Sequence, residues 1–382
     1  MEIVEKHRSN CTECGQCLEV CPRYNDLCLI GRLYSYLEGK AEIDSKFLLR
    51  CLTCGLCVDA CPENLGIKML ISPARQKWVN ENGLTDRQTM VDPESKNNLF
   101  RKIAELDETH IYKKSPGSVV YFPGCAGTYI NKIMAQSTVA LLEKAAVDYT
   151  VLSGVEYCCG AVSAGAGDPG PMRRNGQLNI EEIRRRGAKI LITACPGCFK
   201  AFKDIYPRMF ENLDFQVLHV SQYLELLVRE GKLIPETVLK HRVFYHDPCH
   251  LTRAMGVNQE ARDVLKSIQG TELANETTEN SACCGFGGGV RVNYPSESLD
   301  IASDRYRAAE KLGCDVIITN CGGCMQNLIE AGKGEIIKVF DLAEYLSLAC
   351  GIKIERDDTR MLELVNKAYR LCVSGYGKSD DC

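Results

Sequence analysis

The chain has 382 residues, of which 25% are charged and 45% are hydrophobic, and its formal net charge is −4. These values are typical of a soluble globular protein of two or three domains and give no electrostatic reason to expect nucleic acid or anionic lipid as a partner. The N-terminus has no apolar run, and nowhere do 18 apolar residues follow one another, so we expect neither a secretory signal nor a transmembrane helix. The 23 cysteines are therefore expected in a reducing cytoplasm, as metal-bound thiolates rather than disulfides.

The first elements along the chain are two cysteine runs, each with the pattern C-x₂-C-x₂-C-x₃-C-P of ferredoxins that hold two clusters. The fourth cysteine of each run normally serves the other cluster. We assign to the first cluster Cys11, Cys14, Cys17 and Cys61, and to the second Cys21, Cys51, Cys54 and Cys57. Zinc is the alternative, because C-x₂-C pairs also bind zinc. Residues 26–50 look helical, so residues 1–75 are predicted to form an α-helical two-cluster ferredoxin domain.

Residues 76–115 are polar and are predicted to be a linker with one short helix, and residues 356–382 a polar C-terminal tail. Between them strands and helices alternate. In the half that spans 116–233 we expect strands at 118–122, 149–152 and 189–193 and helices at 131–146 and 176–186. In the half that spans 234–355 we expect strands at 243–246, 272–274 and 316–319 and helices at 258–267 and 296–312. Such alternation predicts small parallel sheets with flanking helices.

Each half contains the same five-cysteine pattern, which indicates an internal duplication. The first set is Cys125, Cys158, Cys159, Cys195 and Cys198, and the second is Cys249, Cys283, Cys284, Cys321 and Cys324. Ligands gather at the carboxyl ends of strands in open α/β sheets, and one cysteine or more of each set follows a predicted strand. Five thiolates exceed the need of one zinc ion or one cubane, so we expect two unusual iron–sulfur centres. A structural zinc site that uses four of the five cysteines is the alternative.

These motifs resemble the cysteine-rich CCG-domain family, in which this cysteine pattern binds a non-cubane four-iron cluster. A ferredoxin domain followed by two CCG domains is similar to the D-subunit family of heterodisulfide reductases, which corresponds to fused C and B subunits. The resemblance implies two cubane and two non-cubane [4Fe-4S] clusters. It also implies reduction of a disulfide of the CoM-S-S-CoB type, with electrons from a flavoprotein or cytochrome b partner. Any association with a membrane would then run through that partner.

Several residues near the motifs are candidates for a role in this reaction. The resemblance implies that Cys159 and Cys284 take part in catalysis. His246 and His250 flank the first cysteine of the second set, and a side chain with a reference pKa of about 6.5 could supply protons. Equally, either ring could only hydrogen-bond a cluster sulfide or cap a strand end. Anionic coenzyme tails would need cations, and the nearby candidates, which could equally be solvated surface residues, are Arg173, Arg174, Arg253 and Arg291.

Two other functions fit the same motifs. The chain could be a non-catalytic electron-transfer subunit that passes electrons from a flavin-dependent lactate, glycolate or glycerol-3-phosphate dehydrogenase to quinone. It could also be a zinc-stabilised scaffold, which predicts zinc at the five-cysteine sets and iron only in the ferredoxin domain.

Overall fold

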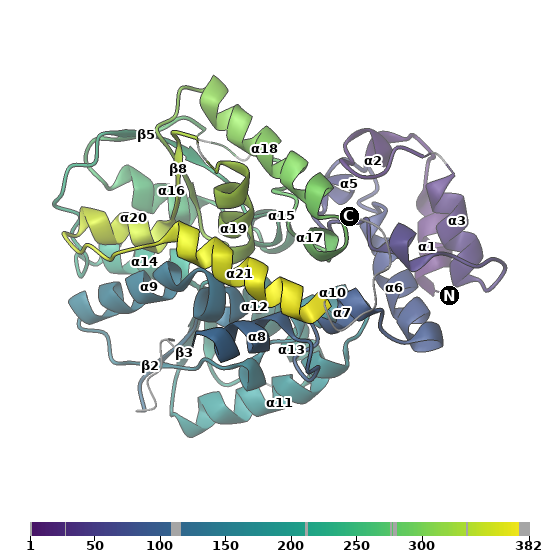
Figure 1. Cartoon of the computed structure of the whole chain (residues 1–382), viewed down its shortest axis with the longest axis horizontal. Helices are drawn as coiled ribbons and strands as arrows, with labels where there is room; N and C mark the ends of the chain where they lie inside the picture. Colours follow the sequence, from purple (N-terminus) through teal and green to yellow (C-terminus); the bar gives the residue numbers. More distant parts are fainter. Residues whose placement is uncertain are drawn as a thin grey trace.

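The computed structural model describes residues 2–26, 28–107, 116–210, 213–275, 277, 281–333 and 335–373. Its N-terminal domain is helical, as predicted, and lies at one side of the molecule (Figure 1). Its helices are α1 (Glu2–Asn10), α2 (Gln16–Glu19), α3 (Leu29–Leu37), α4 (Ser45–Leu48), α5 (Leu56–Asp59) and α6 (Lys68–Asn82). Leu29, Leu33 and Leu70 form its core and are fully buried. Gly15 and Gly55 adopt left-handed φ angles of 81° and 84° and turn the chain into α2 and α5.

The rest of the molecule contains two four-stranded parallel sheets with the same strand order. The first sheet has the order β2-β1-β3-β4 and the second the order β6-β5-β7-β8. The strands of the first are β1 (Val119–Phe122), β2 (Tyr149–Val151), β3 (Ile190–Thr193) and β4 (Gln216–His219). Those of the second are β5 (His241–Tyr245), β6 (Thr271–Leu273), β7 (Val316–Thr319) and β8 (Lys338–Asp341). The shared order confirms the predicted duplication of the α/β domain.

Helices connect the strands in both copies. The first copy contains η1 (Ala126–Ile130), α9 (Lys132–Lys144), η2 (Val155–Tyr157), α10 (Ala161–Gly165), α11 (Gly170–Arg185), α12 (Pro196–Lys200), η3 (Ala201–Ile205), α13 (Tyr206–Met209) and α14 (Val220–Arg229). The second contains α15 (Cys249–Met255), α16 (Gln259–Lys266), α17 (Val290–Asn293), α18 (Pro295–Lys311), α19 (Gly322–Ala331) and α20 (Leu342–Ala349). The copies share a core in which α9 packs on α20 and α14 on α16. Helix α11 begins at Gly170 rather than at residue 176, because Pro171 suits the first turn of a helix.

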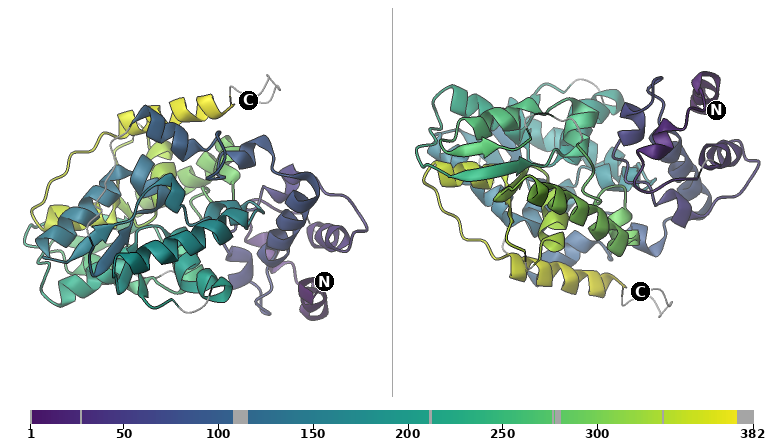
Figure 2. Two further views of the ribbon diagram at one scale, coloured as in Figure 1. Left: turned by 90° about the horizontal axis from the view of Figure 1, so that it is seen from below. Right: turned by 90° about the horizontal axis from the view of Figure 1, so that it is seen from above.

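Two segments contain more structure than we expected. The stretch predicted as a linker with one short helix holds the end of α6 together with α7 (Asp86–Thr89) and α8 (Leu99–Leu106). The predicted tail contains the helix α21 (Asp358–Val373), which runs along the surface and packs on α8 (Figures 1 and 2). Ile103 and Ala368 are fully buried between the two helices. Each helix pairs a narrow apolar stripe with many charged residues, so the two segments read as polar in the sequence. Residues 108–115 and 374–382 of these predicted segments lie outside the described part of the chain.

Within the described ranges, none of the helices combines the length and the apolar character needed to span a membrane.

Candidate iron–sulfur sites

Four cysteines stand at the carboxyl ends of strands and at the start of helices. Cys125 follows β1 and precedes η1, and Cys195 follows β3 and precedes α12. In the second copy, α15 begins at Cys249 after β5, and Cys321 stands between β7 and α19. Free amides at a helix start favour a thiolate over a thiol. At Cys195 a hydrogen bond from Cys198, helped by the backbone N–H groups of Cys198 and Gly197, lowers the thiol pKa to about 7.

The fold gathers the five cysteines of the first set. The Sγ atoms of Cys159 and Cys198 are 3.2 Å apart, although the residues are 39 positions apart in the chain. Cys125 and Cys158 also share a hydrogen bond, which raises the pKa of Cys125 and lowers that of Cys158. Gly160 follows the cysteine pair with a φ of 72°, and a Cβ there would lie 2.4 Å from the Cα of Met172. The glycine thus lets the pair turn directly into α10.

The second set has the same sulfur geometry and a histidine beside it. The Sγ atoms of Cys284 and Cys324 are 3.2 Å apart, and Cys283 hydrogen-bonds Cys249. The ligand atoms of His246, Cys284 and Cys324 all lie within 4.8 Å of one another. His246 is 2% exposed, and within the described residues its Nε2 atom has no hydrogen-bond partner. Of the two histidines that the sequence singled out, His246 is therefore the one that lies against the sulfur atoms.

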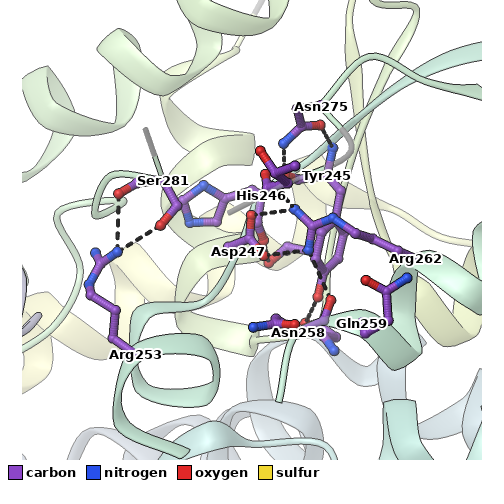
Figure 3. Close-up of polar contacts among 12 residues, drawn as sticks. Tyr245, His246, Asp247, Arg253, Asn258, Gln259, Arg262, Asn275 and Ser281 are labelled. Atoms are coloured by element: carbon purple, nitrogen blue, oxygen red, sulfur yellow. Dashed lines mark hydrogen bonds and ion pairs between the residues drawn. The ribbon is translucent and has the colours of Figure 1, made fainter. Parts of the chain in front are cut away.

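A network of polar contacts holds the loop that carries His246 (Figure 3). Asp247 and Arg262 form a bidentate ion pair with both N···O distances at 2.8 Å, and both side chains are at most 2% exposed. The Arg262 guanidinium also lies over the Tyr245 ring, 4.9 Å from its centroid. On the other side of the loop, Arg253 donates to the carbonyl and hydroxyl oxygens of Ser281 at 3.0 and 2.8 Å. These contacts fix the loop between β5 and α15, which carries His246.

The electrostatic partners of the ferredoxin cysteines follow the two predicted groups. The pKa of Cys17 is raised by burial and then by the charges of three cysteines from the same predicted group, Cys11, Cys61 and Cys14. The pKa of Cys57 is raised to about 12 by burial and then by the charges of Cys51, Cys54 and Cys21, the other three cysteines of its own predicted group. The fourth cysteine of each run thus acts on the third cysteine of the other run, Cys61 on Cys17 and Cys21 on Cys57. The ligand assignment itself stays a prediction.

The second ferredoxin run touches the second five-cysteine set directly, which the sequence did not reveal. The thiols of Cys54 and Cys283 are hydrogen-bonded to each other, and this bond lowers the pKa of Cys54 to about 6. Arg253 Nε donates to the carbonyl of Cys54 at 3.0 Å. Gly288 lies so close that a Cβ on it would be 2.0 Å from the carbonyl oxygen of Cys51. A local sequence pattern cannot predict a contact between residues about 230 positions apart, because the contact forms only when the domains dock.

Most of the other candidate side chains have partners within the protein. His250 lies at the same domain contact, where its Nε2 is 3.4 Å from the Thr53 hydroxyl, and burial lowers its pKa to about 4, with Lys68 and Lys200 adding to the effect. Three of the four arginines that were expected to bind anions also have protein partners. Arg291 pairs with Glu330 at 2.6 Å and Arg174 with Glu94 at 2.6 Å, while Arg173 is exposed. Arg253 is buried in the domain contact, so it is not a solvated cation.

The donor atoms suit iron–sulfur clusters. Each five-cysteine set offers thiol sulfurs, which are the ligands of Fe–S clusters and of zinc. Glycines keep the surroundings open: a Cβ on Gly124 would lie 3.1 Å from the Sγ of Cys198 and from the Cβ of Cys195. Each set contains one sulfur more than a tetrahedral zinc site uses, and the second set adds an unpartnered imidazole nitrogen.

Comparisons with known proteins agree with this assignment. The model of the cysteine-rich domain (CCG) matches residues 119–203 and 243–329, and the model of a 4Fe-4S dicluster domain matches residues 3–62. The D subunit of dihydromethanophenazine:CoB–CoM heterodisulfide reductase from Methanosarcina acetivorans is 34% identical over 247 residues, which are 62% of this chain and 60% of that protein.

Two further relatives have different names. The B subunit of fumarate reductase (CoM/CoB) from Methanothermobacter marburgensis is 29% identical over 360 residues, 91% of this chain and 62% of the relative. EtfAB:quinone oxidoreductase of Syntrophomonas wolfei is 33% identical over 240 residues, 59% of this chain and 33% of the relative. The chain thus spans about three-fifths of the length of the first two relatives and a third of the last.

Proposed function

This chain belongs to the iron–sulfur oxidoreductase subunits that combine a 4Fe-4S dicluster domain with two CCG cysteine-rich domains, and we propose that it is the catalytic subunit of a heterodisulfide reductase-like complex. Its substrate in this proposal is a small disulfide of the CoM-S-S-CoB type. The observation that supports the proposal most is that both five-cysteine sets are complete and converge, with Sγ–Sγ distances of 3.2 Å in each.

The reaction requires two electrons and two protons, because RS–SR′ + 2e⁻ + 2H⁺ gives RSH + R′SH. When bound, two cubane clusters in the ferredoxin domain and two non-cubane clusters at the CCG sets would supply the electron transfer and the iron to which sulfur can bind. The ligands of the CCG sets are Cys125, Cys158, Cys159, Cys195 and Cys198 in the first copy and Cys249, Cys283, Cys284, Cys321 and Cys324 in the second. The reductant is a flavoprotein or cytochrome b partner, and any association with a membrane runs through that partner.

The second CCG set is where we propose that electrons arrive from the ferredoxin domain. The contact between Cys54 and Cys283 supports this order, because it joins a cysteine of the second ferredoxin group to one of the second CCG set. The two CCG copies also touch near their sets: Asn131, which follows η1, donates through Nδ2 to the carbonyl of Gly322 at 2.7 Å. Electrons can therefore continue from the second copy to the first over a short path.

His246 is the proposed source of protons for the departing thiols. Its ring lies among the sulfur atoms of the second set, and its Nε2 is free of other partners in the described residues. His250 is a weaker candidate because its ring faces Thr53 in the domain contact. General acids of this kind contribute about 10²- to 10⁴-fold to a rate.

One observation favours a second function. The relative named EtfAB:quinone oxidoreductase matches 59% of this chain at 33% identity. The alternative is therefore an electron-transfer subunit of a flavin-dependent dehydrogenase complex, which passes electrons on to quinone and reduces no disulfide.

An anaerobic assay with reduced viologen separates the two. The protein, with its four clusters verified by iron analysis, should oxidise reduced viologen only when a disulfide such as CoM-S-S-CoB is present. A series of small disulfides should be tried, and Cys314 provides a matched control: Cys314→Ser removes a buried thiol outside both sets and should leave the rate unchanged. If the fully loaded protein turns over no disulfide yet reduces a quinone analogue, the chain is an electron-transfer subunit.

A further inference from the structure

Arg75 is a buried cation with an unusual set of partners. It lies on α6, is 2% exposed, and is among the largest fully buried side chains. Its guanidinium donates only to backbone carbonyl oxygens: to Leu48 through Nε and Nη2 at 3.0 and 2.8 Å, to Cys51 through Nη2 at 2.8 Å, and to Gly165 through Nη1 at 2.7 Å. These carbonyls belong to the ferredoxin domain and to the first CCG copy, so one side chain joins the two.

The other buried arginines of the described chain have carboxylate partners. Arg23 pairs with Glu297, Arg186 with Glu182 at 2.9 Å, and Arg262 with Asp247 at 2.8 Å. Across the described ranges, no carboxylate acts on Arg75. Burying a charge is costly unless an opposite charge compensates it, and carbonyl dipoles supply only part of that compensation. The positive charge of Arg75 is therefore only partly compensated by the carbonyl groups, and an anion close to the guanidinium would stabilise it.

The ionisable groups that act on Arg75 are Cys51 and Tyr24. The phenol of Tyr24 donates to the carbonyl of Phe47 at 2.6 Å, and burial raises its pKa far above the physiological range, so it stays neutral. Cys51 remains. It is 9% exposed, and its own carbonyl accepts a hydrogen bond from Arg75. Because Cys51 is an expected ligand of the second ferredoxin-type cluster, that cluster would supply the anion beside Arg75 when it is bound.

The position of Arg75 is fixed from both sides. Gly167 packs on the α6 backbone so tightly that a Cβ there would be 2.6 Å from the carbonyl oxygen of Arg75. Gln88 donates to the carbonyl of Ala166 at 2.7 Å, and Ser163 donates to that of Val91 at 3.0 Å. The guanidinium thus cannot move away when the charge beside it changes.

We propose that Arg75 is the fixed counter-charge of the second ferredoxin-type cluster, and that it makes this cluster the easier of the two to reduce. Reduction adds a negative charge to the cluster, and a cation held nearby at low dielectric stabilises the reduced form. The proposal rests on the ligand set of Cys21, Cys51, Cys54 and Cys57, but it does not require that the protein reduces a disulfide. Arg75 would then set the direction of electron flow from the first cluster to the second.

The test is redox titration of the two ferredoxin-type clusters, followed by low-temperature electron paramagnetic resonance. Arg75→Gln should lower the ratio of reduced to oxidised second cluster at a fixed potential by about tenfold, which is about 59 mV for one electron. The first cluster should titrate as in the unmodified protein. Arg75→Lys, which keeps the charge, should shift the second cluster by less than about threefold. Arg356→Gln, which removes a mostly buried arginine from its pair with Glu344, should shift neither cluster.

Two outcomes would overturn the proposal. One is an unshifted second cluster in Arg75→Gln protein that retains its full iron content. The other is loss of the second cluster in both Arg75→Gln and Arg75→Lys, which would mean that the shape of the guanidinium is needed rather than its charge. Neither outcome depends on viologen oxidation, so the result stands apart from the test of the proposed function.

Discussion

The two CCG copies share a fold and a sulfur arrangement but differ at the strand that leads to the first cysteine. In the second copy the three residues before this cysteine are His246-Asp247-Pro248, which follow β5, and in the first they are Phe122-Pro123-Gly124, of which Phe122 ends β1. Phe122 is buried against Phe202, with ring centroids 5.1 Å apart, whereas His246 lies among sulfur atoms. The difference shows that the duplicated scaffold places sulfur atoms in both copies, whereas the proposed proton donor belongs to the second copy.

The copies also differ in how they meet the ferredoxin domain. The second copy meets it at the cysteines themselves, through Cys54 and Cys283. The first copy meets it through the backbone carbonyl of Gly165, which accepts from Arg75. This contact between cysteines is the reason that we propose the second copy as the one that receives electrons from the ferredoxin domain.

Replacing a cysteine of the adjacent pair gives the largest expected effect. Cys284→Ser and Cys159→Ser should each abolish disulfide turnover. This loss is larger than the roughly 10- to 100-fold loss that follows removal of a residue that hydrogen-bonds a metal ligand. The two variants should differ in partial reactions: Cys159→Ser protein should still reduce its second CCG site quickly, whereas Cys284→Ser should slow reduction of both sites. Freeze-quenched paramagnetic spectra report both. Identical behaviour of the two variants would contradict the proposed difference between the copies.

His246 tests whether proton supply belongs to the second copy alone. His246→Gln should lower turnover by about 10²- to 10⁴-fold while iron content and cluster spectra stay unchanged. The matched control is His241→Gln, since that ring bonds Tyr345 at 3.2 Å and lies outside the sites, so turnover should stay within about twofold of normal. Full activity in His246→Gln would remove the histidine from the mechanism.

The buried ion pair of the second copy predicts a difference in stability. Asp247→Asn leaves Arg262 charged and unpaired in the interior, so the free energy of unfolding should fall by about 3–5 kcal/mol. Glu94→Gln removes the carboxylate of the exposed Arg174 pair and should cost at most about 1 kcal/mol. Anaerobic denaturant unfolding, followed by circular dichroism, measures both. Equal losses would show that the Asp247 pair is not desolvated.

Two glycines with the same backbone angle give the smallest and most selective comparison. Gly288 and Gly313 both have a φ of 64°, but a Cβ would be 2.0 Å from the carbonyl of Cys51 at Gly288 and would meet nothing within 4 Å at Gly313. Gly313→Ala should cost about 1 kcal/mol of stability through backbone strain alone. Gly288→Ala should have the same strain cost and should in addition slow electron transfer from the ferredoxin domain to the second copy. Equal transfer rates in the two variants would mean that this contact is not part of the electron path.

Much of this could be predicted from the sequence, because the determinants are local. Cysteines placed directly after apolar runs such as 189–193 predicted both the strands and the sulfur positions at their ends. The helix α21 was missed because its apolar residues form a narrow stripe in a charged segment and are buried only by packing on α8. The contact of Cys54 with Cys283 could not be predicted, nor could the burial of Arg253, since both depend on how two domains dock. His246 and His250 look alike in HDPCH, and only the folded structure distinguishes them: His246 lies beside Cys284 and Cys324, whereas His250 contacts Thr53 of the ferredoxin domain.

The order in which the two CCG sites are reduced tests the account most directly. Anaerobic oxidised protein is mixed with its reductant, frozen at successive times, and examined by low-temperature paramagnetic resonance, with the Cys284→Ser variant used to assign the second site. We predict that the signal of the second CCG site appears first and that of the first site follows it. Reduction of the first site before the second, or reduction of the first site at the normal rate in Cys284→Ser protein, would contradict the account.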